Sequence, residues 1–389
     1  MELSGNRGPS AVNLFYSFLR LGLTAFGGPA MIAHIKELSV TRKRWLDEAT
    51  FNDGIVLCQS IPGATAMQMA AYVGLKTRGL TGALLAYTGF GLPAFLLMLV
   101  FSAVYMEHRS LSLVTSLFNG LQVIVVAIVA HAAYSFGRRG IKSMRDVFIV
   151  LASSGLLLAG VNPFAVIAAS AASGALFFRN KTPFPAIAVE TSKVKSPAKS
   201  TVFLTIAFAA ALFILFFIHR GLALLAFTML KVDLFAFGGG FASVPLMFHE
   251  VVTLRGWMDG KSLMDGIALG QITPGPIVIT ATFVGYLLYG MTGAVVSTIA
   301  VFTPSLLILA FAAPVFERMK TSELFNGAVK GILASFVGLL LFVVIKFGVA
   351  VPWDTARLLL ACAALIALVK KIDILYVVLA GAALSLILF

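Results

Sequence analysis

Apolar runs separated by short polar turns cover almost the whole sequence, and they limit its fold more than any other feature. They lie near residues 12–34, 53–75, 80–105, 114–136, 146–160, 163–178, 201–218, 222–247, 263–289, 291–315, 326–350, 355–369 and 372–389. About 20 apolar residues suffice for a helix to cross the hydrocarbon core of a bilayer. The chain is 60% hydrophobic and 12% charged, whereas a soluble domain is roughly 25% charged. We therefore expect an all-α polytopic membrane protein.

The sequence contains the same set of motifs twice, in the same order. RWLDEATFNDGIVLCQSIPG at 44–63 matches GWMDGKSLMDGIALGQITPG at 256–275 without a gap. AFGG at 25–28 recurs at 236–239, GLTGA at 79–83 recurs as GMTGA at 290–294, and FNG at 118–120 recurs at 325–327. We infer a duplication, with one repeat at 11–178, a polar linker and connecting span at 179–220, and a second repeat at 221–389.

The number of apolar runs predicts that the two repeats are inverted. Six runs precede the linker, one follows it, and six more complete the chain, so the connecting span would turn the second repeat upside down. Inverted repeats of this kind are typical of secondary transporters.

Positive charges indicate which side of the membrane each loop occupies, because cytoplasmic loops carry an excess of Lys and Arg. The cations after the fourth run and in the linker predict a cytoplasmic N-terminus and an outer C-terminus. The loop with Lys36, Arg42, Lys43 and Arg44 would then lie outside. Either the inverted duplication forces this exception, or the broken first and second segments are re-entrant and the loop stays inside. The first residues lack the pattern of a signal peptide, so we expect the first spans to direct insertion.

The net charge of +13 has three readings: a nucleic-acid partner, the positive-inside excess of an inner-membrane protein, or cations that face an anionic substrate. We favour the second and expect the bilayer, not nucleic acid, as the partner. Cys58 and Cys362 are isolated, and the five histidines show no metal-ligand spacing. No catalytic signature is present. We therefore expect neither an enzyme nor a metal or cofactor site.

Glycine and proline interrupt four of the apolar runs. The interruptions are FGGP at 26–29, SIPGA within 60–64, FGGG at 237–240 and TPGP at 273–276. Non-helical backbone is costly in hydrocarbon unless protein, water or a ligand satisfies it. Each break creates a half-helix whose first N–H groups carry partial positive charge and favour anions. We expect four broken helices that converge near the membrane midplane on a small anion.

Cations occupy the same position in both repeats. Arg20 and Lys231 each lie six residues before the FGG of their repeat, inside an apolar run. Charges within spans are expensive and mark functional sites by default. The alternative is that both side chains extend to an interface. The duplicated position favours substrate binding.

Polar side chains near the second break of each repeat are further candidates. Gln59 with Ser60, and Gln271 with Thr273, are candidates for substrate binding or for hydrogen bonds between helices. Asp53 and Asp265 are either helix caps or sites of ion coupling. Asp233 has Gly22 as its counterpart, and it either neutralises Lys231 or carries a coupling proton in one repeat only.

The duplicated AFGG, W-x-D, DG and Q-x-x-PG motifs resemble those of the chromate ion transporter family in its long, two-domain form. The resemblance covers the chain except the region 179–220. It implies an inner-membrane protein that exports chromate by means of the proton-motive force, with sulfate as a competitor. It also implies that the binding motif comprises Gly27, Gly28, Pro62, Gly63, Gly238, Gly239, Pro274 and Gly275. Gly240 stands where the first repeat has Pro29.

Without the resemblance, the residues indicate only a carrier of small anions. A carrier of another oxyanion and an anion channel with a glycine-lined filter are the alternative functions. A homodimer is also possible.

Overall fold

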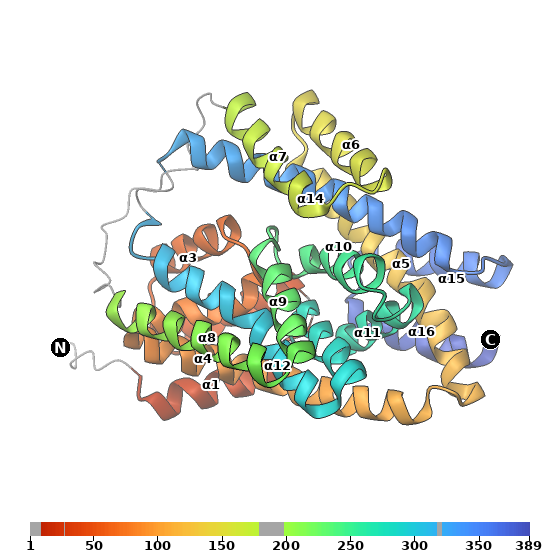
Figure 1. Ribbon diagram of the computed structural model, residues 1–389, viewed down its shortest axis with the longest axis horizontal. Coiled ribbons are helices and arrows are strands. Elements are labelled where there is room, and N and C mark those ends of the chain that lie inside the picture. The colour runs from red at the N-terminus through yellow and green to blue at the C-terminus, as the bar shows by residue number, and fades with distance from the viewer. Residues whose placement is uncertain (1–8, 27, 179–197, 317–320) are drawn as a thin grey trace.

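The computed structural model describes residues 9–26, 28–178, 198–316 and 321–389. This part of the chain is helical throughout and contains no strand. Five of its helical segments are long and apolar enough to cross a membrane. The first repeat contains α1 (Ala11–Thr24), α2 (Gly28–Lys36), the π-turn η1 (Glu37–Arg42), α3 (Glu48–Ser60), α4 (Thr65–His108), α5 (Ser112–Gly140), α6 (Met144–Leu158) and α7 (Pro163–Phe177) (Figure 1).

The second repeat contains the corresponding helices in the same order, with two additional 3₁₀ turns. It consists of α9 (Arg220–Leu234), η2 (Gly240–Ala242), α10 (Ser243–Met247), η3 (Phe248–Leu254), α11 (Gly260–Ile272), η4 (Ile277–Ile279), α12 (Thr280–Ala312), α14 (Glu323–Ala350), α15 (Thr355–Val369) and α16 (Ile374–Leu388). The packing also repeats, because α1 lies along α4 as α9 lies along α12. The predicted two-repeat helical architecture is confirmed.

The helix between the repeats, α8 (Ala198–Ile218), is apolar on all sides, yet almost none of it is buried by the protein. A helix that is hydrophobic all round is stable only in an apolar environment, so α8 faces lipid. As one crossing between two equivalent repeats, it accounts for their opposite orientation. Accordingly, α1 and α8 begin toward one end of the long axis, and α16 ends at the other (Figure 1). The cationic linker residues 179–197 and Arg318 with Lys320 lie outside the described residues.

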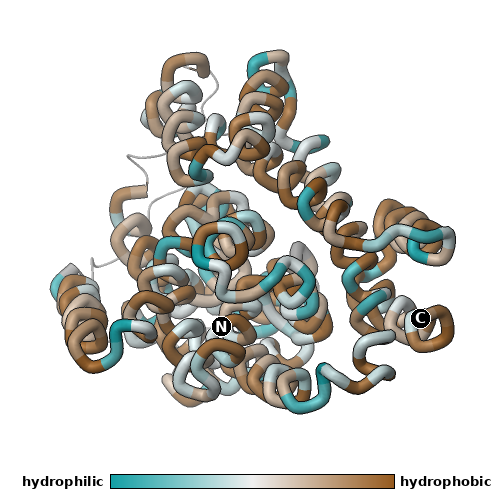
Figure 2. Tube along the Cα trace, turned by 45° about the vertical axis from the view of Figure 1, so that its right-hand side comes forward, coloured by the Kyte–Doolittle hydropathy of each residue, from teal (hydrophilic) through white to brown (hydrophobic). Residues whose placement is uncertain are grey.

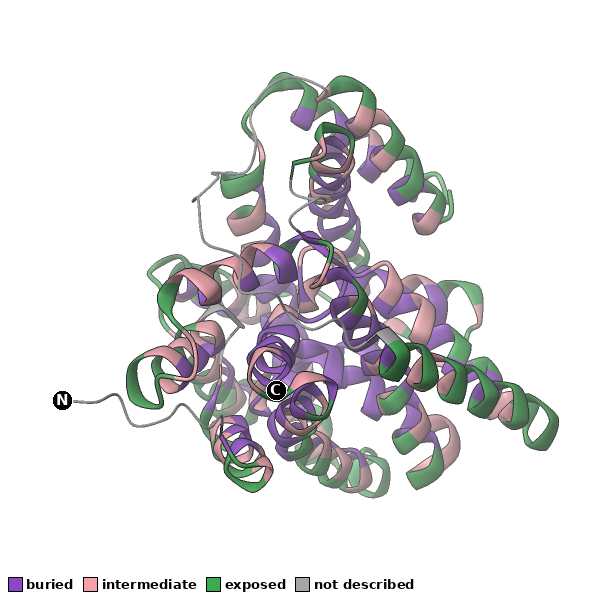
Figure 3. Ribbon diagram, turned by 90° about the vertical axis from the view of Figure 1, so that its left-hand side faces the viewer, coloured by how far each residue is buried: buried purple, intermediate pink, exposed green. Residues whose placement is uncertain are grey.

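The outward surface is largely apolar, and polar residues gather at turns (Figure 2). Buried residues are concentrated in the centre of the molecule (Figure 3). This distribution fits a protein whose periphery is solvated by lipid rather than water.

The last helices of each repeat pack against a helix of the other repeat. α5 of the first repeat packs against α15 and α16, while α14 of the second packs against α6 and α7. Small residues make the approach close: a Cβ on Gly174 in α7 would lie 2.4 Å from the Gly327 carbonyl oxygen in α14. Such contacts between small residues are the usual means by which helices associate in a bilayer.

Both α4 and α12 are helical hairpins. The backbone of α4 leaves helical geometry at Arg78 and Gly79, and that of α12 does so at Tyr289 and Gly290. A Cβ on Gly74 would lie 2.1 Å from the carbonyl oxygen of Gly82, which shows that the arms touch beside the turn. The GLTGA and GMTGA motifs therefore encode these turns.

All four predicted breaks are present. α1 ends at Thr24 before α2 begins at Gly28, and α3 ends at Ser60 before α4 begins at Thr65. In the second repeat, the segments between α9 and η2 and between α11 and η4 are non-helical. Gly27 lies outside the described residues.

The broken segments fold back at their breaks rather than continuing straight. Gly54 in α3 and Tyr72 in α4 lie about two turns on either side of a break, yet a Cβ on Gly54 would be 2.5 Å from the Tyr72 ring. Gly266 and Phe283 repeat this contact at 2.4 Å. Re-entrant hairpins are thus the alternative that the structure favours. They return the loop at 43–47 to the side where α1 begins, which removes the conflict in the charge pattern.

Candidate functional site

Three of the four breaks meet in the interior. The N–H of Gly63 donates a 3.0 Å hydrogen bond to the carbonyl of Ala236, and thereby links the PG turn of the first repeat to the FGGG break of the second. A Cβ on Gly239 would lie 3.3 Å from Thr65 Oγ1, and one on Gly240 would lie 3.1 Å from Ile277 Cγ2. The breaks at 61–64, 235–239 and 273–276 therefore form one central cluster, which we call the break cluster.

The glycines of the break cluster have conformations that few other residues adopt. The φ angles are 118° at Gly63, 95° at Gly238, 94° at Gly239 and 128° at Gly275. Positive φ is strained for residues with a Cβ. The two PG turns, with Pro62 and Pro274, are also fully buried. A backbone requirement thus accounts for the glycines of the motif, and their part in substrate binding stays a prediction.

Each PG turn packs on the other repeat. A Cβ on Gly63 would lie 2.3 Å from the Cβ of Ser305 in α12, and one on Gly275 would lie 2.8 Å from that of Ala94 in α4. Ser305 and Ala94 each follow a proline inside their helix, Pro304 and Pro93. A proline removes one helical hydrogen bond, so polar backbone groups become available beside the turns.

Asp233 is hydrogen-bonded to the residue that follows Pro304. Its side chain is fully buried, and Oδ2 accepts a 2.8 Å hydrogen bond from the N–H of Ser305. The hydroxyl of Tyr87 lies 3.0 Å from Ser305 Oγ and donates to the Phe302 carbonyl at 2.7 Å. The expectation that Asp233 neutralises Lys231 is not met, because Asp233 turns toward α12.

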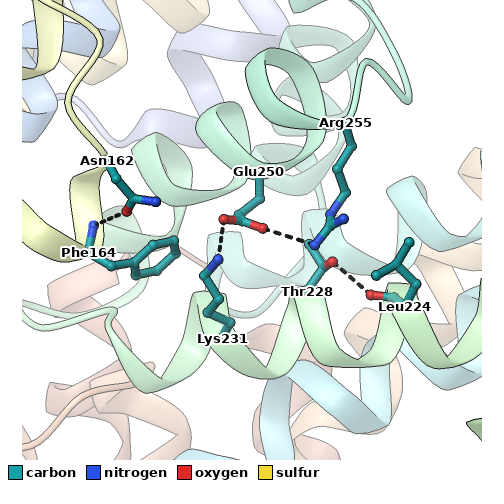
Figure 4. Close-up of polar contacts among 7 residues, drawn as sticks. All are labelled: Asn162, Phe164, Leu224, Thr228, Lys231, Glu250 and Arg255. Atoms are coloured by element: carbon teal, nitrogen blue, oxygen red, sulfur yellow. Dashed lines mark hydrogen bonds and ion pairs between the residues drawn. The ribbon is translucent and has the colours of Figure 1, made fainter.

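Lys231 instead forms an ion pair with Glu250 (Figure 4). Its Nζ lies 2.6 Å from Glu250 Oε1 and 4.2 Å from the ring centre of Phe164. Arg255 approaches the other oxygen of Glu250 at 3.5 Å. The Glu250 side chain is fully buried, whereas that of Lys231 is 36% exposed. The pair joins the two arms of the hairpin made by α9 and η3, so the charge of Lys231 is directed at Glu250 rather than at the break.

Arg20 has a different environment, although it occupies the same position in its repeat. It is exposed on α1. The counterpart of Glu250 in the first repeat is Leu38, which carries no charge. Among the described residues, this cation position therefore forms an ion pair in the second repeat and none in the first.

The hydroxyls before the PG turns are bonded to their own helices. Ser60 donates to the carbonyl of Val56 at 2.7 Å, and Thr273 donates to that of Gly270 at 2.9 Å. The amides differ: Gln59 is exposed, and the buried Nε2 of Gln271 has no acceptor in the described part of the chain. Gln271 therefore offers a donor beside the break cluster.

Asp53 and Asp265 are not helix caps. The caps are Asp47 and Asp259 of the W-x-D motifs, which accept from the N–H groups of Thr50 and Ser262, both at 2.7 Å. The Thr50 N–H lowers the pKa of Asp47, because it stabilises the carboxylate. The cap interpretation was wrong because each helix begins a turn and a half earlier than we expected.

Asp265 holds α11 against the first repeat. Its Oδ2 accepts from the Tyr105 hydroxyl of α4, and its Oδ1 accepts from Gln122 Nε2 of α5, both at 2.8 Å. At the equivalent places around Asp53 stand Phe316 and Val329, which cannot donate. Asp53 itself is half-buried.

The two repeats are therefore packed differently around α3 and α11. α11 lies against α5 and α16, whereas α3 makes no comparable contact with α14 or α7. One stripe of α3 is partly or fully exposed, and the same stripe of α11 is mostly buried; the pairs are Asn52 and Met264, Asp53 and Asp265, Val56 and Ala268, and Gln59 and Gln271. Neighbouring helices therefore cover α11, whereas the equivalent face of α3 is left exposed.

Sequence reasoning missed Glu250, Tyr105, Gln122, Gln68 and Ser305. Each is a polar residue in or beside an apolar run, and its position among apolar neighbours was the only signal that the sequence offered. The search for duplicated positions passed over them because none has an identical counterpart in the other repeat.

The chromate transporter family model matches residues 12–175 and 223–386. An uncharacterized transporter of Methanocaldococcus jannaschii is 45% identical over 97% of this chain and 94% of its own. The chromate transport protein of Cupriavidus metallidurans is 30% identical over 94% of this chain and 90% of its own, and that of Pseudomonas aeruginosa is 31% identical over 84% and 78%. No solved structure matches. On these grounds, this integral membrane protein belongs to the chromate transporter family.

Proposed function

We propose that this protein is a secondary carrier that exports chromate from the cytoplasm across the inner membrane, is driven by the proton-motive force and thereby confers chromate resistance. The observation that carries the proposal is the unequal packing of α3 and α11. Two segments with nearly the same motif adopt a covered and an uncovered state in one molecule. A carrier needs this asymmetry, because exchange of the two states opens the site to each side in turn. A channel needs no such difference.

The break cluster has features that suit a small oxyanion. The N-terminus of α4 has no side-chain cap, which leaves its first N–H groups to an anion. The N-terminus of α12 continues from η4, and its first N–H donates to the Ile277 carbonyl. Gln59 and Gln271 add amide donors beside the two PG turns. Chromate and sulfate are both tetrahedral dianions, so we expect sulfate to compete for the site.

The coupling candidates have unequal support. Asp265 joins the covered α11 to α4 and α5, so a proton on its carboxylate would weaken the contact that covers it. Asp53 occupies the uncovered side, and Asp233 lies at the break cluster. Arg20 and Lys231 lie away from the breaks, and we assign them attraction of the anion rather than its coordination.

The test is chromate uptake into everted vesicles, with vesicles from cells that lack the protein as control. A proton gradient should drive uptake against the chromate gradient, and an uncoupler should abolish it. Excess sulfate should slow uptake. Chromate flux equal to that of the control vesicles, with sulfate carried instead, would overturn the substrate. Chromate flux that only dissipates its own gradient would favour a channel.

A further inference from the structure

Two buried oxygen atoms beside the break cluster lack hydrogen-bond donors among the described residues. They are Oδ1 of Asp233 in α9 and Oε1 of Gln68 in α4. Both side chains are 0% exposed. An unpaired buried acceptor costs about 1–3 kcal/mol, and an ionised one costs more. Their coincidence at the centre of the molecule calls for a ligand.

The two side chains flank the same turn, although they come from different repeats. Gln68 Nε2 donates to the carbonyl of Pro62 at 2.6 Å, which turns its Oε1 away from that bond. A Cβ on Gly63 would lie 2.9 Å from Gln68 Nε2 and 3.0 Å from Ser305 Oγ. Asp233 accepts from the N–H of the same Ser305. Gln68, Ser305 and Asp233 therefore surround one PG turn.

The position of Asp233 in its helix makes the carboxylate still less favourable. Asp233 lies in the last turn of α9, where the helix dipole presents negative charge. Half-helix ends of this polarity, together with unwound carbonyls, hold cations in other transporters.

In the described part of the chain, no cation is paired with Asp233. Lys231 and Arg255 are directed at Glu250. Three helices pack against α9: α10 and α12 contain no Lys, Arg, Asp or Glu, and α8 contains one such residue, Lys199 in its first turn. From α4, the titratable group nearest to Asp233 is the Tyr87 hydroxyl, which is bonded to the Phe302 carbonyl.

We propose that Asp233 and Gln68, with the hydroxyl of Ser305, bind one monovalent cation, either Na⁺ or a proton. The proposal rests on the carrier function and deepens it, because a cation at the break cluster would be bound next to the anion. The site belongs to one repeat only. Gly22, the counterpart of Asp233, has no room for a side chain, since its Cβ would lie 2.4 Å from the Phe90 carbonyl oxygen.

The test is the thermal stability of the purified protein, because a ligand that binds the folded state raises its Tm. Na⁺ is compared with choline at constant ionic strength and fixed pH, and a pH series without Na⁺ follows. Unfolding is monitored by tryptophan fluorescence. We expect Asp233→Asn to remove the stabilisation that the cation provides. Gln68→Leu should weaken it, with about a tenfold higher half-maximal concentration if one ligand bond is lost.

A matched control is available in Asp146→Asn. Asp146 is also fully buried with an unpaired Oδ1, but its Oδ2 accepts from Lys142 N–H, Ser143 N–H and the Ser143 hydroxyl at the start of α6. This variant should keep the full cation effect.

The outcomes separate the two cations and test the site. A Na⁺-specific rise in Tm that Asp233→Asn lacks identifies sodium. A pH dependence of Tm that differs between wild type and Asp233→Asn, without a sodium effect, identifies a proton. If wild type shows no sodium effect and shares its pH dependence with Asp233→Asn, the site is refuted. Binding is measured without transport, so failure of chromate uptake would refute the proposed function and leave this result standing.

Discussion

The carboxylate of Asp265 in α11 accepts a 2.8 Å hydrogen bond from Gln122 in α5, and so connects the second repeat to the first. With the bond from Tyr105, it is the polar contact that covers α11. A hydrogen bond to a charged group contributes roughly 1.5–3 kcal/mol, which is enough to change a population of two states by a factor of ten or more.

Gln122→Leu should uncover α11, because it removes one donor from Asp265 and keeps the volume of the side chain. We expect Cys at position 271 to react with a water-soluble thiol reagent about tenfold faster in the Gln122→Leu background. The measurement is the labelling rate in a protein whose own Cys58 and Cys362 are replaced. Val329→Leu, at the equivalent place in α14, is the control and should leave the rate unchanged. Equal rates in both backgrounds would remove Gln122 from the contact.

Access to the two PG turns should differ in the resting protein. Gln59→Cys should be labelled rapidly from one side of the membrane only, and Gln271→Cys slowly, because α3 is uncovered and α11 is covered. Chromate should change the ratio of the two rates if it shifts the exchange between states. Rapid labelling of both positions at once would argue for an open pore.

Lys231→Gln should lower the amount of folded protein as well as transport. It removes the closer partner of the buried Glu250 and leaves only Arg255 at 3.5 Å. Because Lys231 is 36% exposed, the loss should be smaller than the roughly 3–5 kcal/mol of a fully buried pair. Abundance in the membrane and Tm measure this effect. Arg20→Gln is the control, since Arg20 is exposed and should affect transport with normal abundance.

The double variant Lys231→Met with Glu250→Met separates stability from function, because it removes Glu250 together with its closer partner and leaves only Arg255, which is 22% exposed, without a carboxylate. We expect recovery of abundance. If chromate transport also returns to the wild-type level, Lys231 acts only through structure.

Gly63→Ala should prevent folding. The substitution places a Cβ at positive φ and 2.3 Å from the Cβ of Ser305, and both effects oppose the native turn. Gly155→Ala in α6 is the matched control, because nothing lies within 4 Å of the added Cβ and helical Ala is better than Gly by about 0.5–1 kcal/mol. Yield and Tm should fall for the first and hold or rise for the second.

The sequence predicted the features that depend on local chemistry. Adjacent proline and glycine residues disfavour a continuous helix, whereas the single prolines Pro93 and Pro304 stay within one, so the breaks at the two PG pairs could be located from the residues alone. Duplication made the equivalent positions visible, including Arg20 and Lys231.

Features that depend on packing could not be predicted. The fold-back between α3 and α4, for example, depends on the contact of Gly54 with Tyr72. These residues are 18 positions apart, and no helix or turn propensity connects them. The difference between α3 and α11 was equally out of reach. The two helices share the D-G and Q-x-x-P-G pattern, and only their partners, Gln122 and Val329 for example, distinguish them.

The packing of α5 and α14 against the opposite repeats has a consequence for folding during synthesis. α5 ends at residue 140, but α15 and α16, against which it packs, begin only at residues 355 and 374. Contacts between such distant residues form late and slowly. While the ribosome adds the second repeat, the face of α5 that will receive α16 is covered by lipid alone, with the gap at Gly120 awaiting Ser385. Folding of the first repeat is therefore completed only after α16 has been synthesised.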